Sequence, residues 1–418
     1  MAPFSRHDGI LHCEGVSLEA IAATYGTPTY LYSRSAIETA FLDYQSALSD
    51  MPHLICYAVK ANSNLAILNV LAQLGAGFDV VSLGELERVV AAGGDPSKVV
   101  FSGVGKTAAE MQRALDLKIR CFNIESEAEL LSLAELANSA GCVAPISIRV
   151  NPNVDAGTHP YISTGLRENK FGVEVALARQ LYQLANEHAA LNPVGVDCHI
   201  GSQIEEVAPF VQSLECLLDL IHDLRTLDIR LQHIDLGGGL GVNYQAETPP
   251  SIHDYVAVLK ERLADQDLEL VLEPGRSIVA EAGALITEVL YLKPTADKHF
   301  AIVDAAMNDL LRPALYSAWQ DIQPVILHDG ESHAWDVVGP ICETADFLGK
   351  NRAMVLSQGD LLSIMGAGAY GFGMASNYNS RPRVAEVLVQ GETTHLIGKR
   401  ENLSDLWQRE VIPSGEPS

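Results

Sequence analysis

The chain carries little positive charge for its length. Its 418 residues include 28 Lys and Arg against 53 Asp and Glu, so the formal net charge is −25. A surface with this excess of carboxylates repels phosphate backbones and anionic lipids, so nucleic acids and membrane surfaces are poor candidate partners. The 48% apolar and 19% charged residues are typical of a globular chain rather than a disordered one.

Long apolar runs and paired cysteines are also missing. Two uncharged stretches, residues 61–78 and 361–380, are interrupted by asparagines and glycines, and neither is apolar enough to span a bilayer. The first 15 residues lack the apolar core of a secretion signal. The seven cysteines are odd in number and contain no C-x-x-C pair, which indicates reduced thiols. We therefore expect a cytoplasmic protein without a metal site.

An alternation of short β-branched runs and longer helical patterns occupies the first two thirds of the chain. Between the runs, apolar residues recur at helical spacing, as in residues 207–224. Eight such units favour a (β/α)₈ barrel, and a doubly wound open sheet is the structural alternative. The eight candidate strands are Leu54–Lys60, Phe78–Val81, Val99–Ser102, Arg120–Ile124, Pro145–Asn151, Val194–Ile200, Leu231–Leu236 and Glu269–Glu273.

The pattern changes after Arg276, where strand-like runs follow one another without long helices. Turn residues such as Asp329-Gly330 separate them, which predicts a mostly β second domain. We expect an N-terminal segment at 1–25 that packs with this domain, a barrel at 26–276 and the β domain at 277–418. The predicted strands of the β domain are Leu285–Leu292, Phe300–Val303, Trp335–Val338, Leu361–Met365, Val384–Gln390 and Thr393–Ile397.

Reactive residue types stand where the barrel strands end. In this fold, chemistry takes place on the loops after the carboxyl ends of the strands. Lys60 is the last residue of the first strand, Asp79 stands at the second strand, and the sixth strand runs into His199. The seventh strand runs into Gly237–Gly241, and the eighth runs into Glu273–Arg276. Burial of such a lysine would lower its pKa and make its amine nucleophilic.

These residues fit one cofactor, pyridoxal 5′-phosphate. Its aldehyde needs a lysine, its phosphate needs backbone N–H groups, and its ring nitrogen needs a polar partner. Lys60, the glycine run and Glu273 supply them, and His199 could lie against the ring. Structural alternatives stay open for each residue: a buried core histidine at 199, a glycine turn, or an ion pair between Glu273 and Arg276.

Several motifs resemble the fold-type III pyridoxal-phosphate decarboxylases, which pair an alanine-racemase-like barrel with a β domain. The motifs shared with that group are YAVKAN, FDVVSLGEL, NKFGV, HIGSQ, DLGGGLG and EPGR. Four others are similar to the diaminopimelate decarboxylase family: HPYISTGL, RPALY, GPICET and GAGAYGFGMASNYNSRPR. The match follows the family order over nearly the whole chain.

The resemblance implies roles for individual residues. Lys60, His199 and Cys342 would be catalytic, with Lys60 binding the aldehyde, His199 stacking on the ring and Cys342 donating a proton. A homodimer with shared active sites is implied, in which the partner subunit supplies Cys342 and Glu343. The implied cofactor-binding residues are Lys60, Asp79, His199, Ser202, Gly237, Gly238, Gly239, Glu273, Gly275, Arg276 and Tyr370. The implied substrate-binding residues are Arg276, Arg312, Tyr316, Glu343 and Tyr370.

A few positions depart from the family pattern. They are Leu83, Thr344, Ala345 and Val384, and none is an implied site residue. Leu83 replaces a glycine, which leaves the loop geometry near Asp79 open.

The resemblance also implies a reaction: conversion of meso-2,6-diaminoheptanedioate to L-lysine and CO₂, the last step of lysine biosynthesis by that route. Ornithine or arginine decarboxylation is one alternative, but those substrates have no distal carboxylate for paired arginines to bind. Alanine racemase is a second, and it should lack GPICET. A pyridoxal-phosphate-binding protein without catalysis is a third, and it should lack the β domain.

Overall fold

The computed structural model describes residues 3–157, 164–165 and 169–413. It divides into two compact units, which we call the β unit (residues 1–35 and 281–418) and the barrel unit (residues 36–280). In the part of the chain that the structure describes, no helix is long and apolar enough to cross a membrane.

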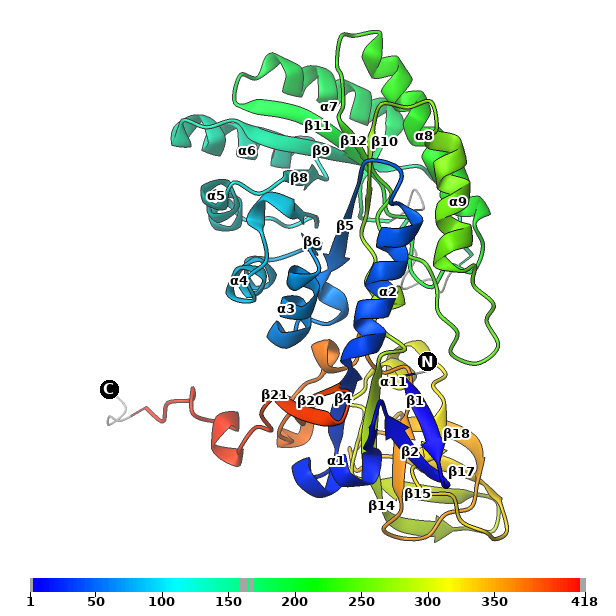
Figure 1. The fold of residues 1–418 in the computed structure, drawn as a ribbon. Coiled ribbons are helices and arrows are strands. Elements are labelled where there is room, and N and C mark those ends of the chain that lie inside the picture. The colour runs from blue at the N-terminus through cyan, green and yellow to red at the C-terminus, as the bar shows by residue number, and fades with distance from the viewer. Residues whose placement is uncertain (1–2, 158–163, 166–168, 414–418) are drawn as a thin grey trace. The chain divides into compact units, whose positions relative to one another are not determined.

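The barrel unit is a closed ring of eight parallel strands (Figure 1). The ring closes because β8 pairs with β9, and β13 pairs with β5 through Leu270 opposite His53. A two-residue strand, β10 (Val173–Glu174), adds to the edge of β9. The closed ring confirms the predicted barrel and excludes the open sheet. The strands in ring order are β5 (His53–Ala58), β6 (Gly77–Val80), β7 (Val99–Phe101), β8 (Cys121–Ile124), β9 (Ala144–Asn151), β11 (Leu191–Asp197), β12 (His233–Asp235) and β13 (Glu269–Leu272).

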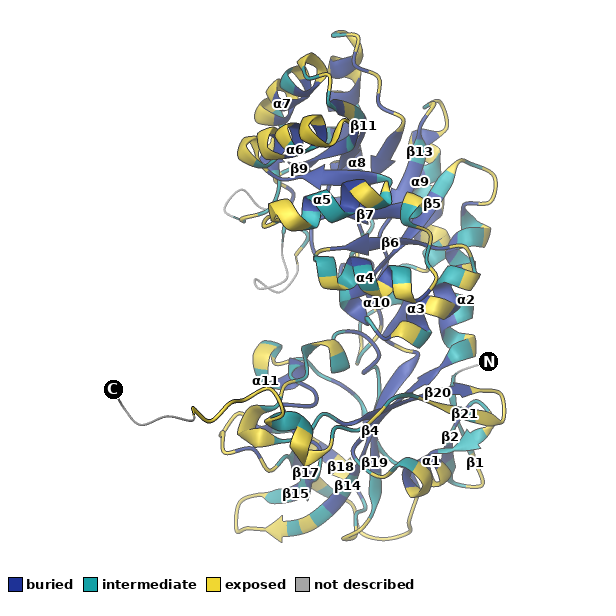
Figure 2. Ribbon diagram, turned by 90° about the vertical axis from the view of Figure 1, so that its left-hand side faces the viewer, coloured by how far each residue is buried: buried dark blue, intermediate teal, exposed yellow. Residues whose placement is uncertain are grey.

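Amphipathic helices follow the barrel strands. The strands are buried, whereas the helices show exposed outer faces in Figure 2. Thr107 and Glu110 form a capping box at the start of α5, which satisfies backbone N–H groups that have no partner inside a helix. The helices are α2 (Arg34–Ala47), α3 (Leu65–Gln73), α4 (Leu83–Ala91), α5 (Ala108–Leu117), α6 (Glu127–Ala140), α7 (Val175–Glu187), α8 (Ala208–Arg225), α9 (Ile252–Leu263) and α10 (Arg276–Val279), with 3₁₀ turns η1 (Val59–Ala61) and η2 (Pro96–Lys98).

The β unit is built on one large sheet and one small one. The large sheet runs in the order β18-β17-β15-β14-β4-β20-β21, with β19 joining β14 and β16. Its strands are β4 (Thr29–Ser33), β14 (Gly283–Pro294), β15 (His299–Val303), β16 (Ile322–Pro324), β17 (His333–Val338), β18 (Phe347–Met354), β19 (Leu361–Ile364), β20 (Ala385–Gln390) and β21 (Thr393–Gly398). The small sheet contains β1 (Phe4–His7), β2 (Ile10–Cys13) and β3 (Val16–Ser17), and the helices are α1 (Leu18–Tyr25) and α11 (Arg312–Tyr316), with 3₁₀ turns η3 (Phe372–Met374), η4 (Tyr378–Ser380) and η5 (Leu403–Leu406).

The unit boundaries differ from the expected ones, because residues 26–35 do not join the barrel. Strand β4 pairs antiparallel with β14 and parallel with β20, and all five of its residues are buried. A short buried strand of this kind satisfies its backbone hydrogen bonds equally well in the barrel sheet and in the large sheet of the β unit. Its sequence therefore does not indicate which of the two sheets it joins. Strands β16 and β18 were not predicted; β16 has three residues including a proline, and β18 carries charged residues at its centre.

Candidate active site

Lys60 and Asp79 lie at the carboxyl ends of two adjacent barrel strands, β5 and β6. Lys60 stands in η1, immediately after β5 rather than within it, and Ala58 of β5 is in register with Asp79 of β6. The Lys60 Nζ donates to Asp79 Oδ2. The Lys60 side chain keeps 35% of its exposure, so it loses less hydration than the sequence argument expected. Asp79 is fully buried, and its second oxygen, Oδ1, has no hydrogen-bond partner among the described residues.

Another lysine of the barrel unit, Lys106, has a buried side chain and a different environment. Its Nζ donates to the Glu129 carboxylate at 2.6 Å and to the backbone oxygens of Asn123 at 2.6 Å and Gly103 at 2.9 Å. These three acceptors use the three donors of an ammonium group. Lys106 is therefore held as a structural cation, and sequence reasoning gave no sign of it.

His199 lies two residues beyond the end of β11 and is oriented by the glycine run. The backbone N–H of Gly238 donates to His199 Nδ1 at 3.3 Å, so the neutral ring carries its proton on Nε2. Burial, followed by the neighbouring charges of Arg149 and Lys60, lowers the pKa of His199 well below its usual value. The imidazole is therefore neutral at physiological pH.

The glycine run packs too tightly for any other residue type at its centre. A Cβ at Gly238 would lie 2.2 Å from the backbone oxygen of Glu273, and Gly239 has a φ of +112°. The Glu273 N–H donates to the Gly237 oxygen at 2.8 Å, which ties the two strand ends together. The backbone N–H groups of Gly239 and Gly275 have no acceptor among the described residues. Such groups at the ends of adjacent strands suit an anion.

Gly238→Ala is expected to damage this turn. The added methyl group must push the β13 end away, and overpacking of this kind costs about 1–3 kcal/mol of unfolding free energy. Thermal or denaturant unfolding measures the loss. Gly105→Ala is the control, since a Cβ at Gly105 meets nothing within 4 Å. Equal stability of the two variants would contradict the tight packing described here.

Glu273 is not paired with Arg276 in the way the structural alternative expected. The Glu273 Oε1 is buried and has no hydrogen-bond partner among the described residues. Arg276 donates to Ser202 Oγ at 2.9 Å and to the Tyr244 hydroxyl at 2.8 Å. Sequence reasoning missed Tyr244, which lies in an irregular loop without a recognisable motif.

Two aspartates on adjacent strands share the surroundings of Glu273. Asp197 ends β11 and Asp235 ends β12; both are buried, and one oxygen from each carboxyl lies within 4.8 Å of one from Glu273. Burial first, then the charge of Asp235, raises the pKa of Glu273 well above its usual value. Burial is also the main cause that raises the pKa of Asp235 to about 7. Acidic residues inside apolar strand runs were the available sequence signal, and our sequence analysis did not use it.

The β unit holds the remaining predicted site residues on loops. Cys342 is exposed, and its N–H donates to the Asn379 side chain at 3.1 Å. The Glu343 Oε1 accepts from the Tyr378 hydroxyl at 2.5 Å. The Asp346 carboxylate accepts from the Ile341 N–H at 2.7 Å and so fixes the start of this loop.

Arg312 and Tyr316 are the first and last residues of α11, so the RPALY motif forms a short helix. The Arg312 side chain is nevertheless buried, whereas helix surface residues are usually exposed. Tyr370 has a φ of +55°, in the left-handed region that is uncommon for a residue with a side chain. Sequence reasoning did not find Tyr378 or Asn379, although both lie in the quoted GAGAYGFGMASNYNSRPR segment.

The structure shows the surroundings of the four residues that depart from the family pattern. Leu83 is the first residue of α4 and its N–H donates to Glu110 Oε1 at 3.0 Å, so no glycine is needed there. Val384 is buried. Thr344 and Ala345 are exposed. Of the HPYISTGL motif, only Thr164 and Gly165 are described; the other six residues lie outside the described part of the chain.

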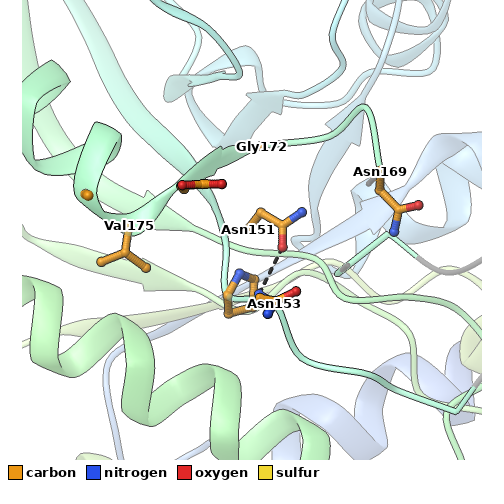
Figure 3. A pocket seen from close by; sticks show the side chains of 8 residues that line it. Asn151, Asn153, Asn169, Gly172 and Val175 are labelled. Carbon is orange, nitrogen blue, oxygen red and sulfur yellow. Dashed lines mark hydrogen bonds between the residues drawn. The ribbon is translucent and has the colours of Figure 1, made fainter. Parts of the chain in front are cut away.

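A cavity of about 340 Å³ lies beside the end of β9. Figure 3 shows Asn151 Oδ1 accepting from the Asn153 N–H at its wall, at 2.9 Å. None of the predicted site residues lines this cavity. Its lining is Asn151, Pro152, Asn153, Asn169, Gly172, Glu174, Val175 and Ala176.

Comparison with known proteins gives a consistent result. Residues 34–280 match the family model for the pyridoxal-binding domain of pyridoxal-dependent decarboxylases. The chain is 58% identical to the diaminopimelate decarboxylase of Vibrio cholerae, over 97% of this chain and 98% of that one. It is also 58% identical to that of Pseudomonas aeruginosa, over 99% of both. The crystal structure of the Helicobacter pylori diaminopimelate decarboxylase complexed with L-lysine matches with a TM-score of 0.91 and 46% identity, covering 94% of this chain and 98% of that one.

Proposed function

This chain belongs to the pyridoxal-dependent decarboxylases, and from that premise we propose that it converts meso-2,6-diaminoheptanedioate to L-lysine and CO₂. One observation carries the proposal: the similarity to diaminopimelate decarboxylases extends over nearly the full length of both chains. The H. pylori relative has L-lysine, the product of this reaction, bound in its structure.

The barrel residues fit pyridoxal phosphate. The Gly238 turn leaves no room for a Cβ, two backbone N–H groups beside it have no acceptor among the described residues, and Glu273 Oε1 is buried without a donor. These features match a phosphate and a protonated ring nitrogen. When bound, the cofactor withdraws electrons from the substrate's α-carbon and so allows the loss of its carboxylate.

The barrel residues would hold and orient this group. Lys60 would bind the aldehyde, Asp79 would hold the lysine amine, His199 would lie against the ring and Glu273 would meet the ring nitrogen. The other residues assigned to cofactor binding are Ser202, Gly237, Gly238, Gly239, Gly275, Arg276 and Tyr370. A neutral His199 suits this role, because a cationic ring there would oppose a protonated ring nitrogen.

Substrate selection requires that one end of a nearly symmetric molecule be anchored. The two ends differ only in configuration, so binding the L end presents the D end for reaction. Arg276 and Arg312 bind the distal carboxylate by charge-assisted pairing, with Tyr316 beside them. Glu343 binds the distal ammonium group, and the Tyr378 hydroxyl fixes its orientation. Tyr370 contacts the substrate, and Cys342 donates the proton that replaces the lost carboxylate.

Lysine formation from meso-diaminoheptanedioate by the purified protein tests the proposal. L-Ornithine and L-arginine are the control substrates, since both lack the distal carboxylate. Lysine and CO₂ release with the first substrate alone is expected. CO₂ release from the controls but not from meso-diaminoheptanedioate would overturn it, as would a yellow protein that releases none.

We further propose that the protein is a cytoplasmic homodimer in which Cys342 and Glu343 complete the active site of the partner subunit. A proton donor must be shielded from bulk water, and the exposed Cys342 would gain that cover from a second subunit. The seven cysteines, without C-x-x-C spacing, support a reducing compartment.

A mixture of Lys60→Ala and Cys342→Ala proteins is expected to regain activity after subunit exchange. A heterodimer would contain one site with both residues intact, so recovery should approach about a quarter of wild-type activity for random pairing. Each variant alone is the control. No recovery, with exchange demonstrated by mass-tagged subunits, would place Cys342 in its own subunit's site.

A further inference from the structure

The carboxyl groups of Asp197, Asp235 and Glu273 form a buried cluster at the ends of β11, β12 and β13. One oxygen from each lies within 4.8 Å of the others. Asp197 and Asp235 are at most 1% exposed and Glu273 is 5% exposed. Each has one buried oxygen without a hydrogen-bond partner among the described residues. These three carboxyl oxygens therefore lack a hydrogen-bond donor in the described part of the chain.

The cations nearest the cluster are shared with other carboxylates. Lys60 pairs with Asp79 on β6. Arg149 on β9 donates to Glu125 at 2.9 Å and stands 3.8 Å from Asp197. Lys60 and Arg149 are therefore shared among five carboxyl groups, which are Asp79, Glu125 and the three of the cluster. Burial of so many like charges disfavours full ionisation.

The cysteine thiols and histidine rings that face the cluster carry no charge at neutral pH. Burial raises the pKa of the Cys56, Cys121 and Cys198 thiols well above their usual value, so they stay protonated. Burial lowers the pKa of His199 and, to about 3, that of His233, so both rings are neutral. Arg120, which also acts on Asp235, is paired with Glu269.

We propose that Asp197, Asp235 and Glu273 share a proton at neutral pH, and that Asp235 is a positioning residue that holds the Glu273 carboxyl through a hydrogen bond made by this shared proton. The backbone N–H of Gly237 fixes Asp235 Oδ1 at 2.8 Å. The other oxygen, Oδ2, is left for Glu273, and the two carboxyls lie close enough to hydrogen-bond once one carries a proton. Glu273 is then oriented toward the position of the cofactor's ring nitrogen, a step that rests on the proposed function.

The shared proton should make the free energy of unfolding depend on pH. The folded-state pKa of Asp235 is about 7, above its ordinary value of 3.8, so between these values the folded chain binds more protons than the unfolded chain. Stability therefore falls as pH rises through this window. An asparagine at 235 has the shape of the protonated aspartate, with a donor for Glu273 and an acceptor for Gly237.

The first experiment compares the melting temperature of the full-length, cofactor-free wild type and Asp235→Asn between pH 5 and 8. The difference between the two is expected to widen as pH rises, because the wild type loses stability between its two pKa values, and the variant should melt roughly 3 °C or more above wild type at pH 8. Asp265→Asn, at an exposed position, is the control and should follow wild type. Superimposable curves for wild type and Asp235→Asn would overturn the proposal. So would a rise in melting temperature with Mg²⁺ or Mn²⁺ that Asp235→Asn abolishes, since the cluster would then be a cation site.

The second experiment separates the hydrogen bond between residue 235 and Glu273 from simple packing at position 235. Asp235→Leu removes both the donor and the acceptor, and should weaken pyridoxal phosphate binding to the cofactor-free protein tenfold or more at pH 7. Asp235→Asn should stay within about threefold of wild type, since it keeps both. Equal weakening by both substitutions would overturn the positioning role. The melting curves need no cofactor, so a failure of the decarboxylase assay would leave their result unaffected.

Discussion

Lys60→Ala is expected to reduce lysine formation to below roughly one ten-thousandth of the wild-type rate. Loss of the residue that binds the cofactor covalently removes an entire mode of catalysis, and such losses are far larger than those of single hydrogen bonds. Lys106, whose side chain is buried in the barrel unit, cannot replace it, because three acceptors hold its amine.

The matched control is Lys60→Arg. It keeps a cation beside Asp79, so the fold and the buried carboxylate should be undisturbed, but a guanidinium does not condense with an aldehyde at neutral pH. Borohydride reduction of the wild type should leave a pyridoxyl group on the peptide that contains Lys60. A label on the Lys106 peptide, or near-normal turnover by Lys60→Arg, would remove Lys60 from its assigned role.

Arg312→Met should lower kcat/KM on meso-diaminoheptanedioate by roughly 30-fold or more. Removing one partner of a desolvated charge pair costs about 2–5 kcal/mol, and each 1.4 kcal/mol is a factor of ten. Visible absorbance of the bound cofactor should remain, because Lys60, His199 and Glu273 are untouched. Steady-state kinetics with the purified holoenzyme measures the effect.

Arg409→Met, a change to an exposed arginine of the same unit, is the control and should have little effect. Glu343→Gln tests the proposed recognition of the distal ammonium group of the substrate. It keeps an acceptor but loses the charge, so substrate binding should weaken while the cofactor stays bound. Full activity of Arg312→Met would make Arg312 a structural residue of α11 and would reopen ornithine-like substrates.

The sequence was most informative where side-chain pattern and backbone geometry depend on each other. All eight predicted barrel strands overlap observed ones, since buried parallel strands need short apolar runs and the intervening helices need an apolar stripe. The glycine run was predicted at the end of the seventh strand, and at its centre only glycine fits, since a Cβ at Gly238 would meet the Glu273 backbone. Residues in irregular loops, such as Tyr244, Tyr378 and Asn379, had no comparable signal.

The sequence by itself determined the family, the barrel and the strand ends at which Lys60, His199 and Glu273 stand. Only the tertiary structure decided that β4 belongs to the β unit, because a short buried strand satisfies its hydrogen bonds in either sheet. Only the tertiary structure placed Asp197 and Asp235 beside Glu273. Residues 38 and 76 positions away along the chain meet there because β12 pairs in parallel with both β11 and β13, which brings the carboxyl ends of the three strands side by side.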